Sequence, residues 1–589
     1  MKPLLVCLVV ALSPRLLPAA TGYLVHNLVA DSKTTATADF YDPLLINPWG
    51  NATSAASPFW VCDLGFSTLY AASATNTTPM GTPNATTKPT VPGAGGSKGS
   101  CTGVIANTAP ATTPPTFPVT APGKAAVAAS FIFVTEDGVL SAWAGGADAT
   151  QAFSIVDNST KASYKGLAIV TTPTPQLYAA NFKTGAIDVF DANYKPVTLA
   201  AGSFVDPKVP AGFAPFNIWN LGGKLYVAYA KQDANQKFDV AGVGNGYVSV
   251  FDPTGKLLAS LVAGGTGSLL NSPWGLAIAP ATFGKFANNL LVGNFGDGLI
   301  NAYDTTTGAF QGTLQDPTGA NIKIPGLWSL LLGNGGNGGD PNIVYFTAGP
   351  GGQKQGLLGS IQANPTVVAT GITSAAQAGA GIAPNTFITI KGANLAATKR
   401  TLVASDITGN LLPTSVDGVT VTVNGQPAFI AYISPVQINL VTPVGLPTSG
   451  TVAVVVSNNT LTSASVNATP QFLAPALFLN GAYAAAYHGN TSNLVGPATV
   501  ANNTPAAPGE TIVMFGTGFG VTNPGAVSGG VVSAAAPLLL TPAILFDNIP
   551  GKVVFAGLIA TGVYQFNVVV PTGLPEHVYP RTFPQFTAE

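Results

Sequence analysis

Charged side chains are scarce in this 589-residue chain, and a few of them stand inside otherwise apolar phrases. Asp, Glu, Lys and Arg make up only 8% of the residues. Glu136 follows the apolar run FIFVT, and Lys231 and Asp233 stand in the phrase VAYAKQDA. A carboxylate or an amine in such a setting can transfer a proton or attack a substrate when its pKa is shifted. We therefore name Glu136, Lys231 and Asp233 as candidate catalytic residues.

A second set of side chains offers oxygen atoms that could bind Ca²⁺. Asn181 and Asn294 end apolar runs, and Asp297 stands in the turn GNFGDG. Together with Glu136 they could supply part of the roughly six to eight oxygen ligands that Ca²⁺ takes. The alternative is that Asp and Asn beside Gly accept hydrogen bonds from their own turns. Both interpretations stay open, and no other cofactor is predicted.

Other catalytic patterns are missing from the sequence. The three histidines are His26, His488 and His577, and no G-x-S-x-G motif supplies a serine nucleophile for them. No Cys–His cluster predicts zinc, and no C-x-x-C-H predicts haem. Exposed tryptophans could form a sugar-binding platform, with packing between repeat units as the alternative; they are Trp49, Trp143, Trp219, Trp274 and Trp328.

The candidate residues belong to a unit that recurs six times. Each unit has a Gly followed five positions later by a bulky residue; the pairs are Gly65 and Tyr70, Gly138 and Trp143, Gly185 and Phe190, Gly246 and Phe251, Gly298 and Tyr303, and Gly356 and Ile361. An apolar run precedes the Gly, and an alternating segment such as AIDVFD follows it, which indicates a β-hairpin. Three or four strands per unit, repeated around a ring, form a β-propeller. The sequence thus predicts an all-β chain with a six-bladed β-propeller over residues 22–365.

Two segments of this region depart from the repeat. We expect the strand YLVHNLVAD at 23–31 to close the ring by joining the last blade, because an open strand edge promotes aggregation. Residues 71–125 are rich in Thr, Pro, Gly, Ala and Ser, which predicts an exposed low-complexity insertion in blade 1. Cys62 and Cys101 are an even pair and predict a disulfide that pins this insertion; the alternative is two buried thiols.

The N-terminus and the overall charge concern the compartment and the partners. A Lys, an apolar run and small residues succeed one another in residues 1–21, the order of a secretory signal peptide. We therefore expect a secreted, cell-surface or periplasmic protein with no transmembrane segment. The net charge of −1 gives no basic field that would attract nucleic acid.

The second half of the chain contains a duplication. The phrase IAPNTFITIKGANL near 382 is echoed by AAPGETIVMFGTGFG near 506, and YISPVQINLVTP near 432 is echoed by TGVYQFNVVVP near 561. Short alternating segments with turn residues between them indicate β-sandwiches. We expect two immunoglobulin-like modules, at 366–475 and 476–589.

Several phrases also resemble known protein families. The stretch 23–362, with NPWG, YKGLAIV and LYAANFKTGAIDVFDANY, resembles an uncharacterised family of exported bacterial six-bladed propellers. The stretch 368–575, with APNTFITIKGANL and PGETIVMFGTGFG, resembles an uncharacterised C-terminal domain family of soil bacteria that is similar to IPT/TIG immunoglobulin-like modules. These resemblances imply the fold and export, and they imply no catalytic residues.

The leading interpretation is a secreted binding or surface-interaction protein whose ligand is an extracellular polymer, such as a glycan, or a protein. The first alternative is an extracellular, calcium-dependent hydrolase or lactonase with its site at the propeller channel. The second alternative is a structural spacer at the cell surface. The sequence does not choose a ligand or an oligomeric state.

Overall fold

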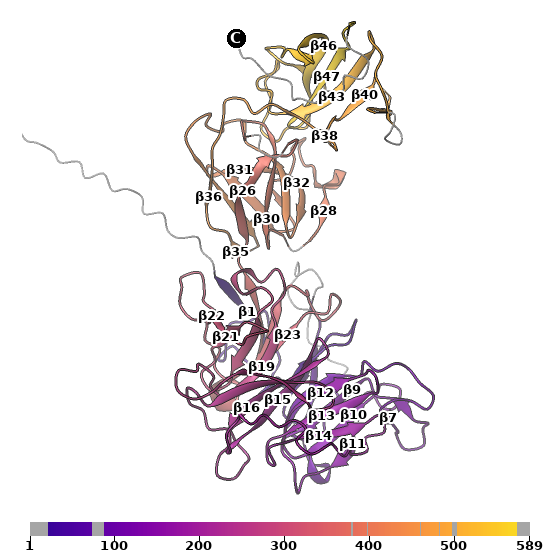
Figure 1. Cartoon of the computed structure of the whole chain (residues 1–589), viewed down its shortest axis with the longest axis vertical. Coiled ribbons are helices and arrows are strands. Elements are labelled where there is room, and N and C mark those ends of the chain that lie inside the picture. Colours follow the sequence, from indigo (N-terminus) through magenta and orange to yellow (C-terminus); the bar gives the residue numbers. More distant parts are fainter. Residues whose placement is uncertain are drawn as a thin grey trace, which may run out of the picture. The chain divides into compact units, whose positions relative to one another are not determined.

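A computed structural model describes residues 22–72, 88–377, 381–396, 398–459, 461–481, 483–489, 491–497 and 503–573. They separate into two compact units, one from Gly22 to Asn364 and the other from Pro365 onward. Both units are built of β-strands, and α1 (Pro350–Gln353) is the one α-helix in the part of the chain that the structure describes (Figure 1). The signal peptide predicted at 1–21 lies outside the described residues.

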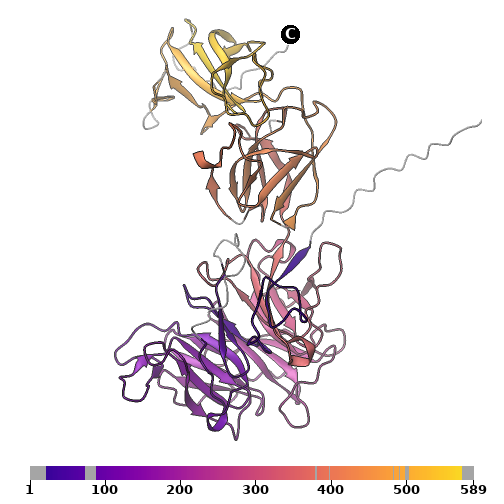
Figure 2. The ribbon, with the colours of Figure 1, turned by 180° about the vertical axis from the view of Figure 1, so that it is seen from behind.

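Six sheets of the first unit each form one blade of a propeller, and Figures 1 and 2 show the strands of this unit from two sides. The blades, in chain order, are β3 (Asn51–Ala52), β4 (Phe59–Cys62) and β5 (Ser67–Tyr70); β6 (Cys101–Ala106), β9 (Phe131–Thr135), β10 (Val139–Trp143) and β11 (Phe153–Asp157); β12 (Tyr164–Val170), β13 (Gln176–Asn181) and β14 (Ala186–Asp191); β15 (Phe213–Leu221), β16 (Lys224–Lys231), β17 (Gly246–Phe251) and β18 (Leu257–Val262); β19 (Pro273–Ile278), β20 (Leu290–Asn294), β21 (Ile300–Tyr303) and β22 (Phe310–Thr313); and β23 (Leu327–Leu332), β24 (Val344–Ala348) and β25 (Leu357–Ala363). The first strand of each blade contacts the first strand of the next, and β23 contacts β3, so the ring closes. The predicted six-bladed β-propeller is confirmed.

The repeated Gly and bulky residue have one structural role in every blade. The Gly lies at or beside the hairpin between the second and third strands, and at Gly65, Gly138, Gly185 and Gly298 its φ is between 74° and 83°. Other residues adopt such angles only with strain. The bulky residue is paired across the ladder with the first apolar residue of the second strand, as Phe190 is with Leu177.

A strand from the N-terminus closes the ring. β1 (Tyr23–Ala30) pairs antiparallel with β25, from Tyr23 opposite Ala363 to Ala30 opposite Leu357, and β2 (Phe40–Tyr41) pairs with β1. The sixth blade is therefore built from both ends of the propeller sequence, which confirms the predicted closing strand. The hydroxyl of Thr347 in β24 also donates a hydrogen bond to the carbonyl oxygen of Trp49, just before β3.

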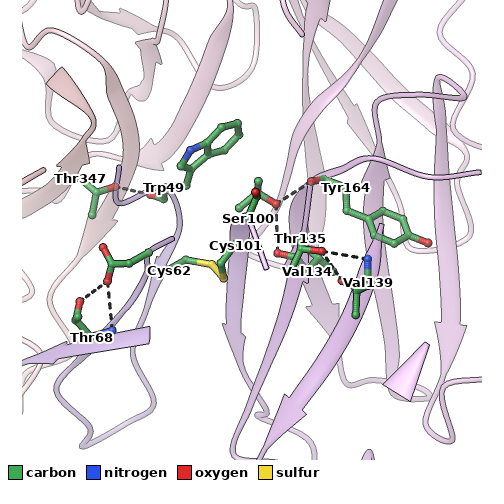
Figure 3. The surroundings of a disulfide bond; sticks show 12 residues. Trp49, Cys62, Thr68, Ser100, Cys101, Val134, Thr135, Val139, Tyr164 and Thr347 are labelled. Carbon is green, nitrogen blue, oxygen red and sulfur yellow. Dashed lines mark hydrogen bonds between the residues drawn. A yellow bond between two sulfur atoms is a disulfide. The ribbon is translucent and has the colours of Figure 1, made fainter. Parts of the chain in front are cut away.

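The predicted disulfide is present and joins two neighbouring blades. Cys62 ends β4 and Cys101 begins β6, with their Cα atoms 5.3 Å apart (Figure 3). The prediction that residues 71–125 are an insertion in blade 1 is wrong for this part, because 101–106 is the first strand of blade 2. The short apolar phrase CTGVIA was masked by the Thr- and Pro-rich composition around it. Residues 73–87 lie outside the described part of the chain.

Between the first and second strands of blade 2 the chain makes a small hairpin. It contains β7 (Pro118–Val119) and β8 (Val127–Ala128). Phe117 and Val119 are wholly buried and pack on the core between blades 2 and 3.

The residues from Pro365 onward begin with a two-sheet sandwich. One sheet has the order β26 (Thr366–Ser374), β27 (Phe387–Ala393), β33 (Gln437–Val441), β32 (Phe429–Ser434) and β28 (Arg400–Thr401); the other contains β29 (Ser415–Val416), β30 (Val419–Val423), β31 (Gln426–Pro427), β34 (Val452–Asn458), β35 (Leu461–Thr462) and β36 (Val466–Ala468). Alternate residues of β30 and β34 are buried against β27, β32 and β33. This is the predicted immunoglobulin-like arrangement.

A second β-module follows, in which nine of the described strands pair in one sheet and two in another. Its strands are β37 (Ala476–Leu477), β38 (Leu479–Asn480), β39 (Tyr483–Ala484), β40 (Ala486–His488), β41 (Leu494–Val495), β42 (Asn503–Thr504), β43 (Thr511–Thr517), β44 (Ala536–Pro537), β45 (Ile544–Phe546), β46 (Ile549–Ala560) and β47 (Val563–Val569). The duplicated Gln and Asn make the same contact in both modules: Gln437 donates to Asn439 at 2.8 Å, and Gln565 donates to Asn567 at 2.7 Å.

Removing the disulfide should destabilise the propeller. The cysteines are separated by 39 positions, and closing a loop of that size contributes about 4 kcal/mol in the chain-entropy description. We expect the double variant Cys62→Ala, Cys101→Ala to lose about that much free energy of unfolding of the propeller in a urea titration. The same titration of wild-type protein with and without reductant is the control. Identical midpoints for oxidised, reduced and mutant protein would contradict the assignment.

Candidate functional site

The first strands of the blades present one side chain each near the propeller axis. Five of these strands have a β-bulge near their N-terminal ends, and in blade 1 Trp49 holds the corresponding place just before β3. A bulge turns a side chain away from the regular alternation of a strand. The residues at this level are Trp49, Thr102, Lys165, Phe216, Trp274 and Trp328.

Aromatic side chains from non-adjacent blades meet at this level. The rings of Trp49 and Trp328 stack with centroids 3.6 Å apart, and the ring of Trp274 stands edge-on to Trp49 at 6.4 Å. Phe216 and Phe295 complete the cluster. Because these residues come from blades 1, 4, 5 and 6, they can touch only at the axis. The axis is therefore filled by aromatic side chains at this level.

The tryptophans thus pack in the core in two different ways. Trp49, Trp274 and Trp328 are almost wholly buried at the axis. Trp143 packs against Trp60 between blades 1 and 2, and Trp219 is half-buried against the core between blades 4 and 5. None of them forms the flat exposed strip that a sugar platform needs.

A buried ion pair lies beside the aromatic cluster. Lys165, at the bulge of β12, is paired with Glu136, which directly follows β9; the side chains are 1% and 16% exposed. The ammonium group of Lys165 also lies 5.4 Å from the ring centre of Trp49 and 5.6 Å from that of Phe182. Burial lowers the pKa of Lys165, and the charge of Glu136 opposes this shift. Such a pair is costly unless its partners stay together.

One exposed aromatic residue covers the ion pair. Phe238, in the loop between β16 and β17, has its ring centre 5.5 Å from the ammonium of Lys165, yet 51% of the residue is exposed. Asp233 holds this loop, since its carboxylate accepts hydrogen bonds from the backbone N–H groups of Lys237 (2.8 Å) and Phe238 (3.1 Å). The neighbouring Asp239 is half-buried, and burial raises its pKa. The site therefore has an apolar face and two carboxylates around one buried amine.

The other residues singled out in the sequence lie outside this cluster. Asn181 donates to Asp188 at 3.1 Å and accepts from the N–H of Ser163, while Asn294 donates to the carbonyl of Leu269 at 2.8 Å.

Asp297 accepts from the N–H of Leu299 and from the side chain of Asn271, and Lys231 is exposed at the end of β16. The structure thus gives both amides and Asp297 hydrogen-bond partners within the propeller, and it brings Glu136 beside Lys165. Among the residues that the structure describes, no three His, Cys, Asp or Glu side chains gather in a metal-binding group.

Lys165 is the site residue that sequence reasoning missed. Its phrase YKGLAIV occupies the same place in the repeat as NPWG at 47–50 and SPWG at 272–275. An alignment of the six units would have shown a Lys where other units have a Trp. That substitution is the signal for a charged group at the axis.

Loss of the buried charge should change how stability depends on pH. Because the pKa of Lys165 is lowered in the folded state, the unfolded chain binds one more proton at pH values between that lowered pKa and about 10.5. Stability contributed by this group therefore rises with pH in that window, by at most about 1.4 kcal/mol per pH unit. We expect urea titrations from pH 7.5 to 10 to show a steeper rise for wild type than for Lys165→Met, Glu136→Gln. Curves of equal slope would contradict this prediction. The tyrosines, which in the unfolded chain also titrate at about pH 10, are the same in both proteins and cannot cause a difference in slope.

Comparisons with known proteins identify one domain of the chain and two relatives. Residues 378–472 match the IPT/TIG domain. The chain is 30% identical over 353 residues to the uncharacterised protein R648 of Acanthamoeba polyphaga mimivirus, a match that covers 58% of this chain and 81% of R648. It is 31% identical over 314 residues to the uncharacterised protein R640 of the same virus, covering 52% of this chain and 54% of R640.

One solved structure similar to this chain is the virginiamycin B lyase of Staphylococcus aureus. The identity is 8% and the TM-score 0.31, over 58% of this chain and 99% of the lyase. No helix among the described residues is long and apolar enough to span a bilayer. On the coverage and identity of the match to R648, the chain belongs to the same protein family as the uncharacterised protein R648 of Acanthamoeba polyphaga mimivirus.

Proposed function

We propose that this protein is an exported binding protein whose ligand contacts the end of the propeller that carries Phe238. The observation that carries the proposal is an exposed aromatic ring lying over a buried ion pair at the propeller axis. An exposed Phe contributes little to the stability of the fold, whereas aromatic side chains contribute strongly to binding.

The ion pair supports the same proposal. Replacing a buried ion pair by apolar residues of similar size is often neutral or stabilising, and the three tryptophans at the same level show that apolar side chains fit there. A Lys–Glu pair at this level is therefore better explained by a ligand than by stability. The carboxylates of Glu136 and Asp239 can accept hydrogen bonds from that ligand.

The ligand class that fits these groups is a carbohydrate. A sugar ring has an apolar face that can lie on Phe238, and its hydroxyl groups can donate to Glu136 and Asp239. Because aromatic side chains fill the axis at this level, a ligand would lie over the ring and not inside a channel, which suits a segment of an extracellular polymer. Metal-dependent hydrolysis is less well supported, because the candidate oxygen ligands for Ca²⁺ are dispersed and already hydrogen-bonded within the propeller.

A structural spacer is the second candidate function, and the contacts between the two sandwich modules favour it. The N–H of Phe387 donates to the hydroxyl of Thr517 at 2.8 Å, the N–H of Leu412 to the carbonyl of Gly529 at 2.9 Å, and the N–H of Val531 to that of Asn410 at 2.8 Å. Backbone contacts in both directions make the two modules one stiff element. Such an element can present a binding domain at a distance from a surface.

The test is a binding screen on an array of extracellular polysaccharides and glycans. We expect labelled wild-type protein to bind at least one carbohydrate, and Phe238→Ala or Asp239→Asn to reduce that binding at least tenfold. The matched control is Phe310→Ala, because Phe310 in β22 is 49% exposed but lies outside the site. Binding that survives Phe238→Ala, or no binding to any carbohydrate, would contradict the proposal.

A further inference from the structure

The seam where the last blade meets the first contains a buried amide with no partner. Asn51 in β3 is 1% exposed, and neither its Oδ1 nor its Nδ2 has a hydrogen-bond partner among the residues that the structure describes. A buried polar side chain without a partner destabilises the fold, because its hydrogen bonds to water are lost and not replaced. Such a group calls for a bound water or ion.

The repeat shows that this amide replaces an apolar residue. Asn51 is paired across the ladder with Val61 in the second strand of its blade. The residues in the same position of the other five blades are Val104, Leu167, Ile218, Leu276 and Leu330. All five are buried aliphatic side chains that pack on the preceding blade. Blade 1 is therefore the one blade with a polar residue at this position, and that residue faces blade 6.

A buried carboxylate faces the same seam. Asp63 follows β4 two positions after Val61, so by strand alternation it points to the same side as Asn51 and Val61. Asp63 is 0% exposed; its Oδ2 accepts the hydroxyl of Thr68 at 2.5 Å, and its Oδ1 has no partner among the described residues. Val61 packs there against Tyr345 and Leu358 of blade 6.

Blade 6 contributes a third unpaired oxygen. Ser360 in β25 is 1% exposed, its hydroxyl is without a partner in the described part of the chain, and it lies two residues from Leu358, on the same side of its strand. An unpaired hydroxyl, an unpaired amide and an unpaired carboxylate oxygen thus belong to the interface between blades 6 and 1.

Two buried carboxyl groups, Asp42 and Asp63, lie at the seam. Asp42 is 4% exposed, accepts the hydroxyl of Tyr70 at 3.2 Å, and has Lys88 at 4.0 Å. Among the residues that the structure describes, Asp63 forms no salt bridge, whereas Lys88 lies near Asp42. Burial raises the pKa of Asp63, and the charge of Asp42 adds to the shift. A bound cation would remove the cost of burying this charge.

We propose that the seam between blades 6 and 1 binds one cation that prefers oxygen ligands, with Asp63 Oδ1, Asn51 Oδ1 and Ser360 Oγ as protein ligands and water molecules completing its shell. Ca²⁺ and Na⁺ share this ligand chemistry. In this proposal the Nδ2 group of Asn51 donates a hydrogen bond to one of these water molecules. The site is separate from the propeller end that carries Phe238, and it would fasten the point at which the ring is closed.

The experiment uses the full chain, transferred into buffer with N-methylglucamine as the only cation. Bound metal is measured by elemental analysis before and after the transfer, and Tm is then measured with Ca²⁺, Na⁺ or K⁺ at constant ionic strength. We expect one of these ions to be retained or to raise Tm by about 3 °C or more, and Asp63→Asn to abolish the response. The identity of the active ion distinguishes a divalent from a monovalent site.

Asn51→Leu separates a cation site from a simple packing defect. Leucine is the residue at this position in blades 3, 5 and 6. If Asn51 is only a buried amide without a ligand, leucine would pack better, and Tm would rise equally in all salts. A cation site would instead lose its response to the ion. Ser141→Ala is the matched control, since Ser141 is also buried and unpaired but belongs to blade 2. No retained metal and equal Tm of wild type in every salt, or a salt-independent gain for Asn51→Leu, would overturn the proposal.

Discussion

The close approach of the six first strands around one axis is the constraint on which the propeller depends. The residue at the next position of each first strand lies against the first strand of the following blade, and it is Gly or Ser in every blade except the fourth. A Cβ on Gly50 would stand 3.0 Å from the carbonyl oxygen of Thr102, and one on Gly275 would stand 2.7 Å from that of Trp328. Where the residue is Asn217, its amide donates to the carbonyl of Trp274 at 2.8 Å. Small or hydrogen-bonding residues at this position let the ring close.

That constraint also decides what can occupy the axis. With the first strands this close, the bulged side chains from opposite blades meet, and three tryptophans and three phenylalanines fill the space. The one charged side chain among them, Lys165, has to find its counter-charge from the neighbouring blade, and Glu136 supplies it. The indole of Trp274 donates to the carbonyl of Lys165 at 2.8 Å and holds its backbone in place. The candidate site is therefore a consequence of how the ring is closed.

Local patterns predicted much of the fold because each has a local physical cause. The Gly before each third strand, the closing strand at 23–31 and the cysteine pair were all visible in the sequence and are found in the structure. The first strand of blade 2 was missed because its six residues are short and surrounded by Thr and Pro. Composition averaged over a long segment cannot reveal a single buried strand.

The site was predicted less well, because it depends on side-chain direction across blades. Glu136 was named, but its partner Lys165 was not, since the two are 29 positions apart and meet through the ring. Asn181, Asn294 and Asp297 were named as candidate Ca²⁺ ligands because of their chemical type, while their hydrogen bonds within the propeller decide their role. Asn51 drew no attention, because only the ladder register shows that its equivalents are aliphatic.

The most direct measurement of the central constraint is the stability of Gly275→Ala, compared with Gly146→Ala as a control. The added Cβ at position 275 would press on the backbone of blade 6, whereas at Gly146 the nearest atom is 4.0 Å away. Overpacking of this kind costs about 1–3 kcal/mol. The account predicts a loss in that range for Gly275→Ala, measured by urea unfolding, and little change for Gly146→Ala. Equal stability of the two variants would contradict the claim that close packing of the first strands closes the ring.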